Sequence, residues 1–257
     1  MPVDNGRQIS HVATPFETTE GAGVSVRRAL PAEDLPYAAV DPFLLLDDFT
    51  TTPGGPGIPE HPHRGQEIIT YVLEGKVKHS DSQGNRAIAH AGGLQRITAG
   101  AGIRHEEGPI EGEMDPVRGL QLWINMALAD KTANPSYQNF ETHQLPRETH
   151  DGSTVKTLVG EGSPTTLHND MTYLDVDMDA GAEFNRDLSV EWQGFVYVLV
   201  GEAEFGANQR QAGSGTLLVL GQGSAFRAMA GNNGARFMLA AGQPHREPVR
   251  WRGPYVD

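Results

Sequence analysis

Four side chains in the first half of the sequence have the types and the spacing to hold a metal ion. The segment EHPHRG places His61 and His63 two residues apart, and GIRHEEG places His105 and Glu107 at the same spacing. In a β-strand, residues i and i+2 lie on one face, so each pair would point the same way. Three imidazoles and one carboxylate suit a divalent transition metal, for which imidazole favours Fe, Ni, Cu or Zn, and they would leave coordination positions open for a reactant.

Composition excludes several other kinds of chemistry. The chain has no cysteine, which excludes disulfide frameworks, thiolate nucleophiles and zinc ribbons, so a metal must be held by His and carboxylate. The formal charge of −13 would repel a nucleic-acid backbone, so no direct nucleic-acid partner is expected. Neither a GxSxG elbow nor a Walker motif is present, so nucleophilic hydrolysis has no support.

The first residues, MPVDNGRQISHVATPFETTEG, have neither the apolar region of a signal peptide nor an Arg-rich transit pattern. The longest apolar runs, such as residues 43–46, are far shorter than the roughly 18 residues that a membrane helix needs. We therefore expect a soluble, cytoplasmic protein with no membrane partner.

The elements that must position these side chains are strands. The 31 Gly and 17 Pro residues separate short apolar runs rich in β-branched and aromatic residues, which predicts an all-β barrel or sandwich. We further expect an early hairpin from HVATPF and VRRALP, and one short turn of helix within residues 129–137. The predicted strands are EIITYVLEG, LQRITAG, GLQLWINM, MTYLDVDM, GFVYVLVGEAEF, GTLLVLGQG and ARFMLAAG.

The order of features occurs twice. YVLEG at residues 71–75 is followed by HAGG and TAGAG, and YVLVG at residues 197–201 is followed by QAG and VLGQG, with offsets of 126 at the first strand and 121 at the third. This repetition indicates a β-barrel built twice, joined through the polar segment KTANPSYQNFETHQLPRETHDG. We predict an N-terminal barrel at residues 1–141 and a C-terminal barrel at residues 142–257. Because two packed barrels already bury their mutual face, a monomer is expected.

Only the first copy carries the metal pattern. Alignment on the YVL strand puts Asp187 and Ser189 opposite His61 and His63. Alignment on the Gly-x-Gly turn puts Phe226 and Ala228 opposite His105 and Glu107. The C-terminal barrel is therefore predicted to lack a ligand set.

Four ordered motifs resemble the pirin family, which are bicupins of the cupin superfamily: HPHRGQEIITYVLEG, TAGAGIRHEEGP, RGLQLWIN and GQPHREPVRWRGPYV. The resemblance runs from about residue 41 to residue 255. It implies two stacked barrels and one metal, usually Fe(II), with Mn, Co, Ni or Cu as alternatives, held by His61, His63, His105 and Glu107. The sequence departs from the family at Gln66, where an aromatic residue commonly follows HPHRG, and it lacks the helical tail of vertebrate pirin after residue 255.

Several pirins are described as quercetinases, so the resemblance implies a metal-dependent dioxygenase of the quercetin 2,3-dioxygenase type, with a flavonol-like substrate and O2. No cofactor beyond the metal is needed, and Glu107 is the natural general base for the substrate hydroxyl. Two other functions stay open. One is a non-catalytic iron or redox sensor that binds a protein partner, as vertebrate pirin is described; the other is an isomerase-like cupin that does not use O2.

Residues near the motifs have plainer interpretations. Glu106 alternates with Glu107 and should face away from the site. Gln121 and Trp123 share a strand face and either line the pocket or belong to the core. Polar contacts around the loop are expected for Arg64 and Glu67, hydrogen-bonded structural roles for His79 and His90, and linker positions for His143 and His150.

Overall fold

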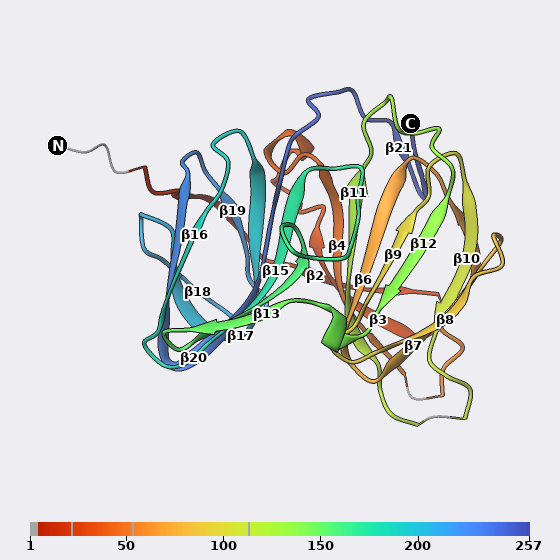
Figure 1. Ribbon diagram of the computed structural model, residues 1–257, viewed down its shortest axis with the longest axis horizontal. Helices are drawn as coiled ribbons and strands as arrows, with labels where there is room; N and C mark the ends of the chain where they lie inside the picture. Colours follow the sequence, from red (N-terminus) through yellow and green to blue (C-terminus); the bar gives the residue numbers. More distant parts are fainter. Residues whose placement is uncertain (1–4, 22, 53, 113) are drawn as a thin grey trace.

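The computed structural model describes residues 5–21, 23–52, 54–112 and 114–257, which fold into two β-barrels lying side by side (Figure 1). Runs of β-branched and aromatic residues fill the pleated surfaces, and Gly-containing turns end the strands. Within these ranges the helical elements are two short 3-10 helices, η1 (Tyr37–Ala39) and η2 (Thr142–Gln144). The expected all-β fold with two barrels in tandem and little helix is confirmed.

The N-terminal barrel consists of two sheets. The larger sheet has the strand order β12-β9-β6-β11-β4-β3-β2, and the smaller one has the order β5-β10-β7-β8. The larger sheet contains β2 (Phe16–Glu20), β3 (Val24–Leu30), β4 (Phe43–Thr51), β6 (Gln66–Glu74), β9 (Leu94–Thr98), β11 (Arg118–Asn125) and β12 (Ser136–Phe140). The smaller contains β5 (Ile58–His63), β7 (Lys76–Asp81), β8 (Arg86–His90) and β10 (Ile103–Gly108).

The C-terminal barrel is one nine-stranded sheet with the path β1-β19-β17-β20-β15-β14-β13, in which β16 pairs with β20 and β18 pairs with β17. Register shifts in the long strand β17 allow it to bend and serve both sides of the barrel. The strands are β1 (Ile9–Ala13), β13 (Arg147–His150), β14 (Ser153–Val159), β15 (Met171–Met178), β16 (Glu183–Asp187), β17 (Gln193–Phe205), β18 (Arg210–Gly213), β19 (Leu217–Leu220) and β20 (Ala225–Gly242).

One local expectation was confirmed in part and another was wrong. An early hairpin is present, but it is formed by β2 and β3, with Phe16 opposite Arg28, whereas most of HVATPF belongs to β1, which pairs with β19 of the C-terminal sheet. Residues 129–137 contain no helix; hydrogen-bonded turns at residues 128–132 lead directly into β12. Both differences arose because pairing with a distant strand outweighs local preference.

The two ends of the chain cross between the barrels. β1 belongs to the C-terminal sheet, whereas the last hairpin, β21 (Trp251–Arg252) and β22 (Tyr255–Val256), lies against the N-terminal barrel, where Tyr255 bridges to Arg64. The middle of the expected linker is also structured, because β12 pairs with β9. A single division between residues 141 and 142 therefore does not describe the two ends of the chain, because each end contacts the barrel formed mainly by the other half of the sequence.

The barrels share a hydrophobic cluster with side chains from both. Phe43 of the N-terminal barrel meets Phe195 of the C-terminal barrel edge to face, with ring centroids 5.2 Å apart, and both are fully buried. Such aromatic contacts stabilise beyond the area that they bury. The C-terminal barrel therefore packs against the larger sheet of the N-terminal barrel.

A buried polar contact crosses this interface. The Tyr71 hydroxyl of β6 donates to Asp175 Oδ2 of β15 at 2.6 Å, and Asp175 also accepts two hydrogen bonds from Arg236 of β20. The carboxylate is 6% exposed, so its charge depends on these partners rather than on water.

An equivalent contact joins a tyrosine of the C-terminal barrel to an aspartate of the N-terminal barrel. Tyr197 donates to Asp48 Oδ2 at 3.0 Å, and Arg118 makes two hydrogen bonds to the same carboxylate. Tyr197 is the counterpart of Tyr71 in the repeat, and each Arg lies two residues before the strand partner of its Asp. This matched pair of contacts supports the internal repeat seen in the sequence.

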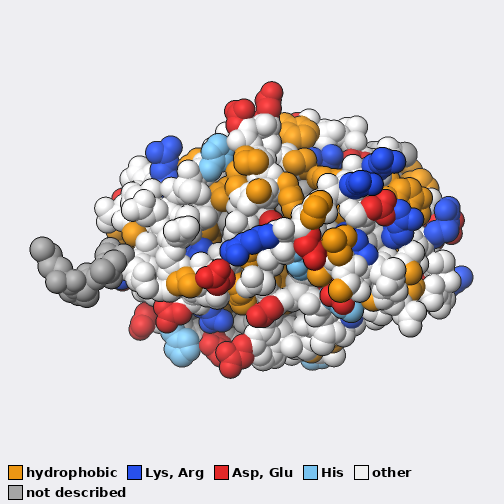
Figure 2. All heavy atoms as spheres, turned by 90° about the horizontal axis from the view of Figure 1, so that it is seen from above, with side chains coloured by type: hydrophobic (Ala, Val, Ile, Leu, Met, Phe, Trp, Pro, Cys, Tyr) orange, Lys and Arg blue, Asp and Glu red, His pale blue; other side chains and the backbone are white. Residues whose placement is uncertain are grey.

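The surface carries charges of both signs. Figure 2 shows acidic and basic side chains interspersed over the face seen from above, so neither sign dominates this face. In the part of the chain that the structure describes, no helix has the length and apolar character needed to cross a membrane.

Removal of one cross-barrel carboxylate should destabilise the protein. Asp175→Ala leaves the Tyr71 hydroxyl and the Arg236 guanidinium without their acceptor, so we expect the free energy of unfolding in urea to fall by roughly 1–3 kcal/mol. Glu17→Ala is the control, since its ion pair with Arg27 is exposed and should contribute less than about 1 kcal/mol. Equal losses in the two variants would contradict this role of the interface.

Candidate metal centre

Three of the four predicted ligands converge between β5 and β10. The strands are antiparallel with His105 directly opposite His61, and His63 lies two residues further along β5. The ring centroids are 4.3 Å apart for His61 and His105, 4.7 Å for His61 and His63, and 5.0 Å for His63 and His105. One nitrogen from each ring lies within 4.8 Å of the other two, which is close enough for a single ion.

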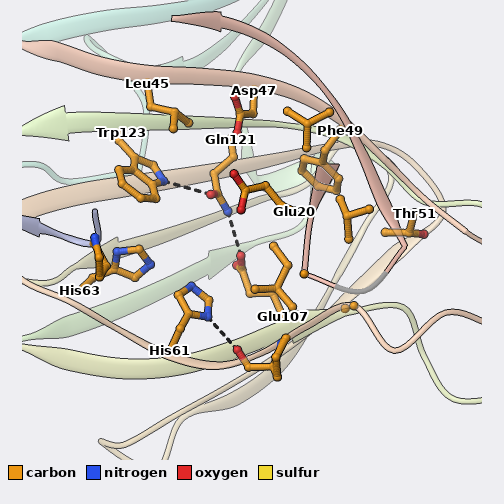
Figure 3. Close-up of a pocket in the computed structure, with 18 of the residues that line it drawn as sticks. Glu20, Leu45, Asp47, Phe49, Thr51, His61, His63, Glu107, Gln121 and Trp123 are labelled. Atoms are coloured by element: carbon orange, nitrogen blue, oxygen red, sulfur yellow. Dashed lines mark hydrogen bonds between the residues drawn. The ribbon is translucent and has the colours of Figure 1, made fainter. Parts of the chain in front are cut away.

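Glu107 is held close to this group but belongs to a second one. Its carboxylate lies within 4.8 Å of ring nitrogens of His105 and His79, so His105 is common to the two groups of candidate ligands. Gln121 Nε2 donates to Glu107 Oε2 at 2.9 Å, and Thr70 donates to Oε1 at 3.3 Å. Figure 3 shows the carboxylate between Gln121 and His61 at the wall of the pocket.

The inward direction of Glu107 depends on a close backbone approach. The β5–β10 register shifts between His105 and Glu107, and Gly57 packs against the backbone there. A Cβ atom on Gly57, whose φ is +72°, would lie 2.6 Å from the Glu107 carbonyl oxygen and from Gly108 Cα. Only glycine fits this approach, so Gly57 permits the bulge in β5, where Pro59 and Glu60 stand against the single residue Glu106, while the regular alternation of β10 keeps His105 and Glu107 on one face. Glu106 accepts a hydrogen bond from Ser80 on the other side of the strand, as expected.

The imidazole nitrogens have the pattern that a metal site requires. His61 Nδ1 lies 2.9 Å from the Pro59 carbonyl, which fixes the proton on Nδ1 and leaves Nε2 as an acceptor facing the site. Both ring nitrogens of His105 are buried without a hydrogen-bond partner in the described part of the chain. Because a buried polar atom without a partner is costly, these nitrogens fit metal ligation better than a structural role.

Gln66 orients the third ring. Its side-chain amide nitrogen is 2.9 Å from His63 Nδ1, while its Oε1 is buried with no partner. With its two amide atoms exchanged, Gln66 accepts a hydrogen bond from His63 Nδ1 through Oε1, which leaves His63 Nε2 for a metal. Gln66 therefore orients a candidate ligand.

Burial keeps the three imidazoles uncharged. Burial lowers the pKa of His63 to about 3, with a further decrease from His61, and burial also lowers the pKa values of His61 and His105. The rings are therefore uncharged near neutral pH, the form that binds metals. Burial raises the pKa of Glu107 to about 7, against the hydrogen bonds from Thr70 and Gln121.

The sequence interpretation missed the position of His79. Its ring is hydrogen bonded, as expected, through Nε2 to Asp81 Oδ2 at 3.1 Å, but it also stacks on Tyr137 and lies 5.5 Å from His105. Nδ1 is 4.0 Å from Glu107 Oε1. The HSD segment has the same two-residue spacing as the ligand pairs, and that was the signal available for finding it.

The remaining histidines lie elsewhere. The side chain of His90 is half exposed and pairs with Glu141. His143 lies in η2, and His150 is exposed in β13. None of these three belongs to a group of candidate ligands in the described ranges.

A cavity of about 640 Å³ is lined by His61, His63 and Glu107. Gln121 and Trp123 line this cavity, so of the two expected positions, pocket or core, the pocket is correct for both. Trp123 Nε1 donates to Gln121 Oε1 at 3.0 Å. Most of the remaining wall is apolar, and a few charged side chains also line it, among them Arg28 with its ion-pair partners Glu20 and Asp47. The apolar wall includes Val24, Val26, Leu45, Phe49, Ile58 and Val77, and the charged residues are Glu20, Arg28, Asp47 and Glu60.

The C-terminal barrel has a filled interior instead. Phe226 and Ala228 are buried there, as the alignment predicted, in a cluster with Phe184, Phe205 and Phe237. The described residues that could group around a metal all lie in the N-terminal barrel.

The alignment with the first histidine pair needs a correction. The cross-strand partner of Phe226 is Arg186, so Arg186, not Asp187, corresponds to His61, and Leu188 corresponds to His63. Leu188 is buried in the phenylalanine cluster. The register between the copies has slipped by one residue, so the offset of the YVL strand does not apply here.

Two barrels, one with a histidine-lined pocket and one with a closed core, define a protein with N- and C-terminal cupin domains. A family model described as Pirin matches residues 23–124, and one described as Pirin C-terminal cupin domain matches residues 173–257. The chain belongs to the pirin family.

Individual relatives agree with this assignment. The chain is 36% identical to human pirin, across 93% of this chain and 84% of that protein, and 36% identical to a pirin-like protein of Caulobacter vibrioides, across 100% and 93%. A crystal structure of quercetin 2,3-dioxygenase from Acinetobacter baumannii superposes with a TM-score of 0.87 at 26% identity, covering 97% of this chain and 91% of that one.

Loss of the shared ligand should abolish metal binding. His105→Ala removes the ring common to both candidate groups, so the purified variant should no longer hold a stoichiometric divalent metal by elemental analysis. His90→Ala, which removes an exposed imidazole, should retain the wild-type metal content. Full metal content in His105→Ala would place the ion elsewhere.

Gln66→Met should weaken the site without removing a ligand. The thioether fills the space but makes no hydrogen bond to His63, so the metal dissociation constant should rise about 10- to 100-fold in competition with a chromophoric chelator. Gln193→Met, at a half-buried glutamine of β17 in the C-terminal barrel, is the control. An unchanged constant would show that Gln66 does not orient His63.

Proposed function

We propose that this protein is a metal-dependent dioxygenase of the quercetin 2,3-dioxygenase type. The observation that carries the proposal is the group of three neutral imidazoles, His61, His63 and His105, which shares His105 with a second group containing the Glu107 carboxylate; His61, His63 and Glu107 line one open cavity. Similarity to the Acinetobacter baumannii quercetin 2,3-dioxygenase supports the reaction class. The proposed ligands are His61, His63, His105 and Glu107, around one Fe(II).

The proposed role of Glu107 follows from its surroundings. Its two oxygens are held by hydrogen bonds from Gln121 and Thr70, and an ionised carboxylate beside a substrate hydroxyl suits a general base. Trp123 holds Gln121 through its indole N–H, and Gln121 in turn donates to one oxygen of the carboxylate. This chain of hydrogen bonds fixes the direction in which Glu107 takes the proton of a substrate hydroxyl.

The imidazoles and the cavity supply the remaining requirements. When bound, the metal supplies Lewis acidity toward a deprotonated substrate oxygen and a redox partner for O2. Imidazole and carboxylate ligands also accept Mn, Co, Ni or Cu. The cavity volume of about 640 Å³ and its largely apolar wall suit a flat aromatic compound of flavonol size.

Oxygen uptake tests the proposal. Protein reconstituted anaerobically with Fe(II) should consume O2 on addition of quercetin, and chelation or His63→Ala should abolish the uptake. Glu107→Gln should reduce turnover by at least about 100-fold while it retains most of the metal, since it removes the base.

Glu106→Gln is the matched control, because the neighbouring carboxylate faces away from the site, and it should leave uptake unchanged. No uptake by fully metallated wild-type protein would refute the dioxygenase. In that case, partner binding that depends on the iron oxidation state would favour the sensor, and product formation without O2 would favour an isomerase.

A further inference from the structure

The last residues of the chain lie at the metal pocket of the other barrel. After β20 completes the C-terminal barrel, the chain returns to the N-terminal barrel, and Figure 1 shows its end at one edge of that barrel. Residues 250–257 contain the hairpin β21–β22, which we call the C-terminal strap. Backbone hydrogen bonds in both directions between Arg250 and Asp257, at 2.8 and 2.9 Å, close it.

The strap is anchored beside a candidate ligand. Arg64, which follows His63, donates its backbone N–H to the Pro254 carbonyl at 3.3 Å and accepts from the Val256 N–H at 3.0 Å. Lys131 Nζ donates to the Val256 carbonyl at 3.1 Å, and the Val256 side chain is fully buried. These contacts fix the strap on the backbone segment that carries the candidate ligands His61 and His63.

Gly65 makes this docking possible. Its φ is +80°, and a Cβ atom there would lie 1.9 Å from the Val256 carbonyl oxygen. The arginine before it adds an ion pair to Asp257 and places its guanidinium 5.3 Å from the centre of the Tyr255 ring. The strap is thus a fixed part of the barrel wall and not a loose terminus.

The strap contributes an aromatic surface to the cavity. Trp251, Gly253 and Pro254 line it, whereas Tyr255 on the same hairpin does not. Trp251 Nε1 donates to the Gly253 carbonyl at 2.7 Å, so the polar end of the indole is satisfied within the strap and its rings serve as an apolar surface.

This surface continues toward the proposed metal. The Trp251 ring lies 6.3 Å from that of Trp123, and Trp123 lies 4.9 Å from the ring of His63. A line of aromatic rings therefore runs from a candidate ligand to the terminal strap. A ligand held at the metal end by one ring would reach Trp251 only if a second flat ring extended along this line.

We propose that the C-terminal strap is the specificity-determining wall of the pocket and that Trp251 selects planar aromatic ligands with more than one ring. This inference rests on the proposed function in assigning the cavity to a substrate. It gives the second cupin domain a part in substrate choice, although its own interior is closed.

Ligand binding without turnover tests the wall. Calorimetric titration of anaerobic, metal-loaded protein with quercetin and with catechol compares a multi-ring ligand with a single-ring one. Trp251→Ala and Trp251→Leu should each raise the quercetin dissociation constant about 3- to 10-fold and change that of catechol less than about twofold. Trp251→Phe should restore most of the quercetin affinity, because it keeps an aromatic face.

Arg252→Ala is the matched control, since Arg252 lies on the same hairpin, is exposed and does not line the cavity, and this variant should bind both ligands like the wild type. All variants should keep the wild-type metal content, which a general collapse of the strap would lower. Unchanged quercetin affinity in Trp251→Ala, or equal losses for both ligands, would overturn the inference.

The outcomes separate this inference from the proposed function. Quercetin that binds through Trp251 without O2 uptake would refute the dioxygenase and leave the wall in place. Turnover with an unchanged KM in Trp251→Ala would do the reverse. Wild-type protein that binds no quercetin would refute both.

Discussion

The antiparallel pairing of β5 with β10 is the constraint on which the candidate site depends. Side chains alternate between the faces of a strand, so a slip of one residue would turn the histidines outward. The pairing of His105 with His61 sets the register, and the close contact at Gly57 accommodates the bulge that follows. Burial by the surrounding sheets then keeps the imidazoles neutral and raises the pKa of Glu107.

The two barrels show two uses of one scaffold. In the C-terminal barrel, Phe226 and its aromatic neighbours fill the interior, so its folding is driven by apolar burial. In the N-terminal barrel, the position aligned with it is His105, whose ring nitrogens have no hydrogen-bond partner among the described residues, and such polar burial costs stability. The shared interface, with its paired Tyr–Asp contacts, lets the closed barrel support the one that contains the pocket.

The crossing of the chain ends joins the barrels functionally as well. The first strand completes the C-terminal sheet, and the last hairpin completes the wall of the N-terminal pocket. Each barrel therefore contains an element encoded at the far end of the sequence. The pocket is thus a property of the whole chain, since Trp251 comes after the second barrel and Trp123 belongs to the first.

The sequence by itself determined the strands, the repeat and the convergence of the histidines, because alternation in a strand is a local property that two-residue spacing reveals. It also indicated which barrel lacks the ligand set, since Phe226 and Ala228 offer no ligand atom. Only the tertiary structure decided that His79 adjoins Glu107, that Gln66 meets His63 and that Trp251 enters the pocket. The spacing in HSD marks His79 as a candidate, but which side chains it, Gln66 and Trp251 meet depends on strand register and on the path of distant segments, which long-range packing sets.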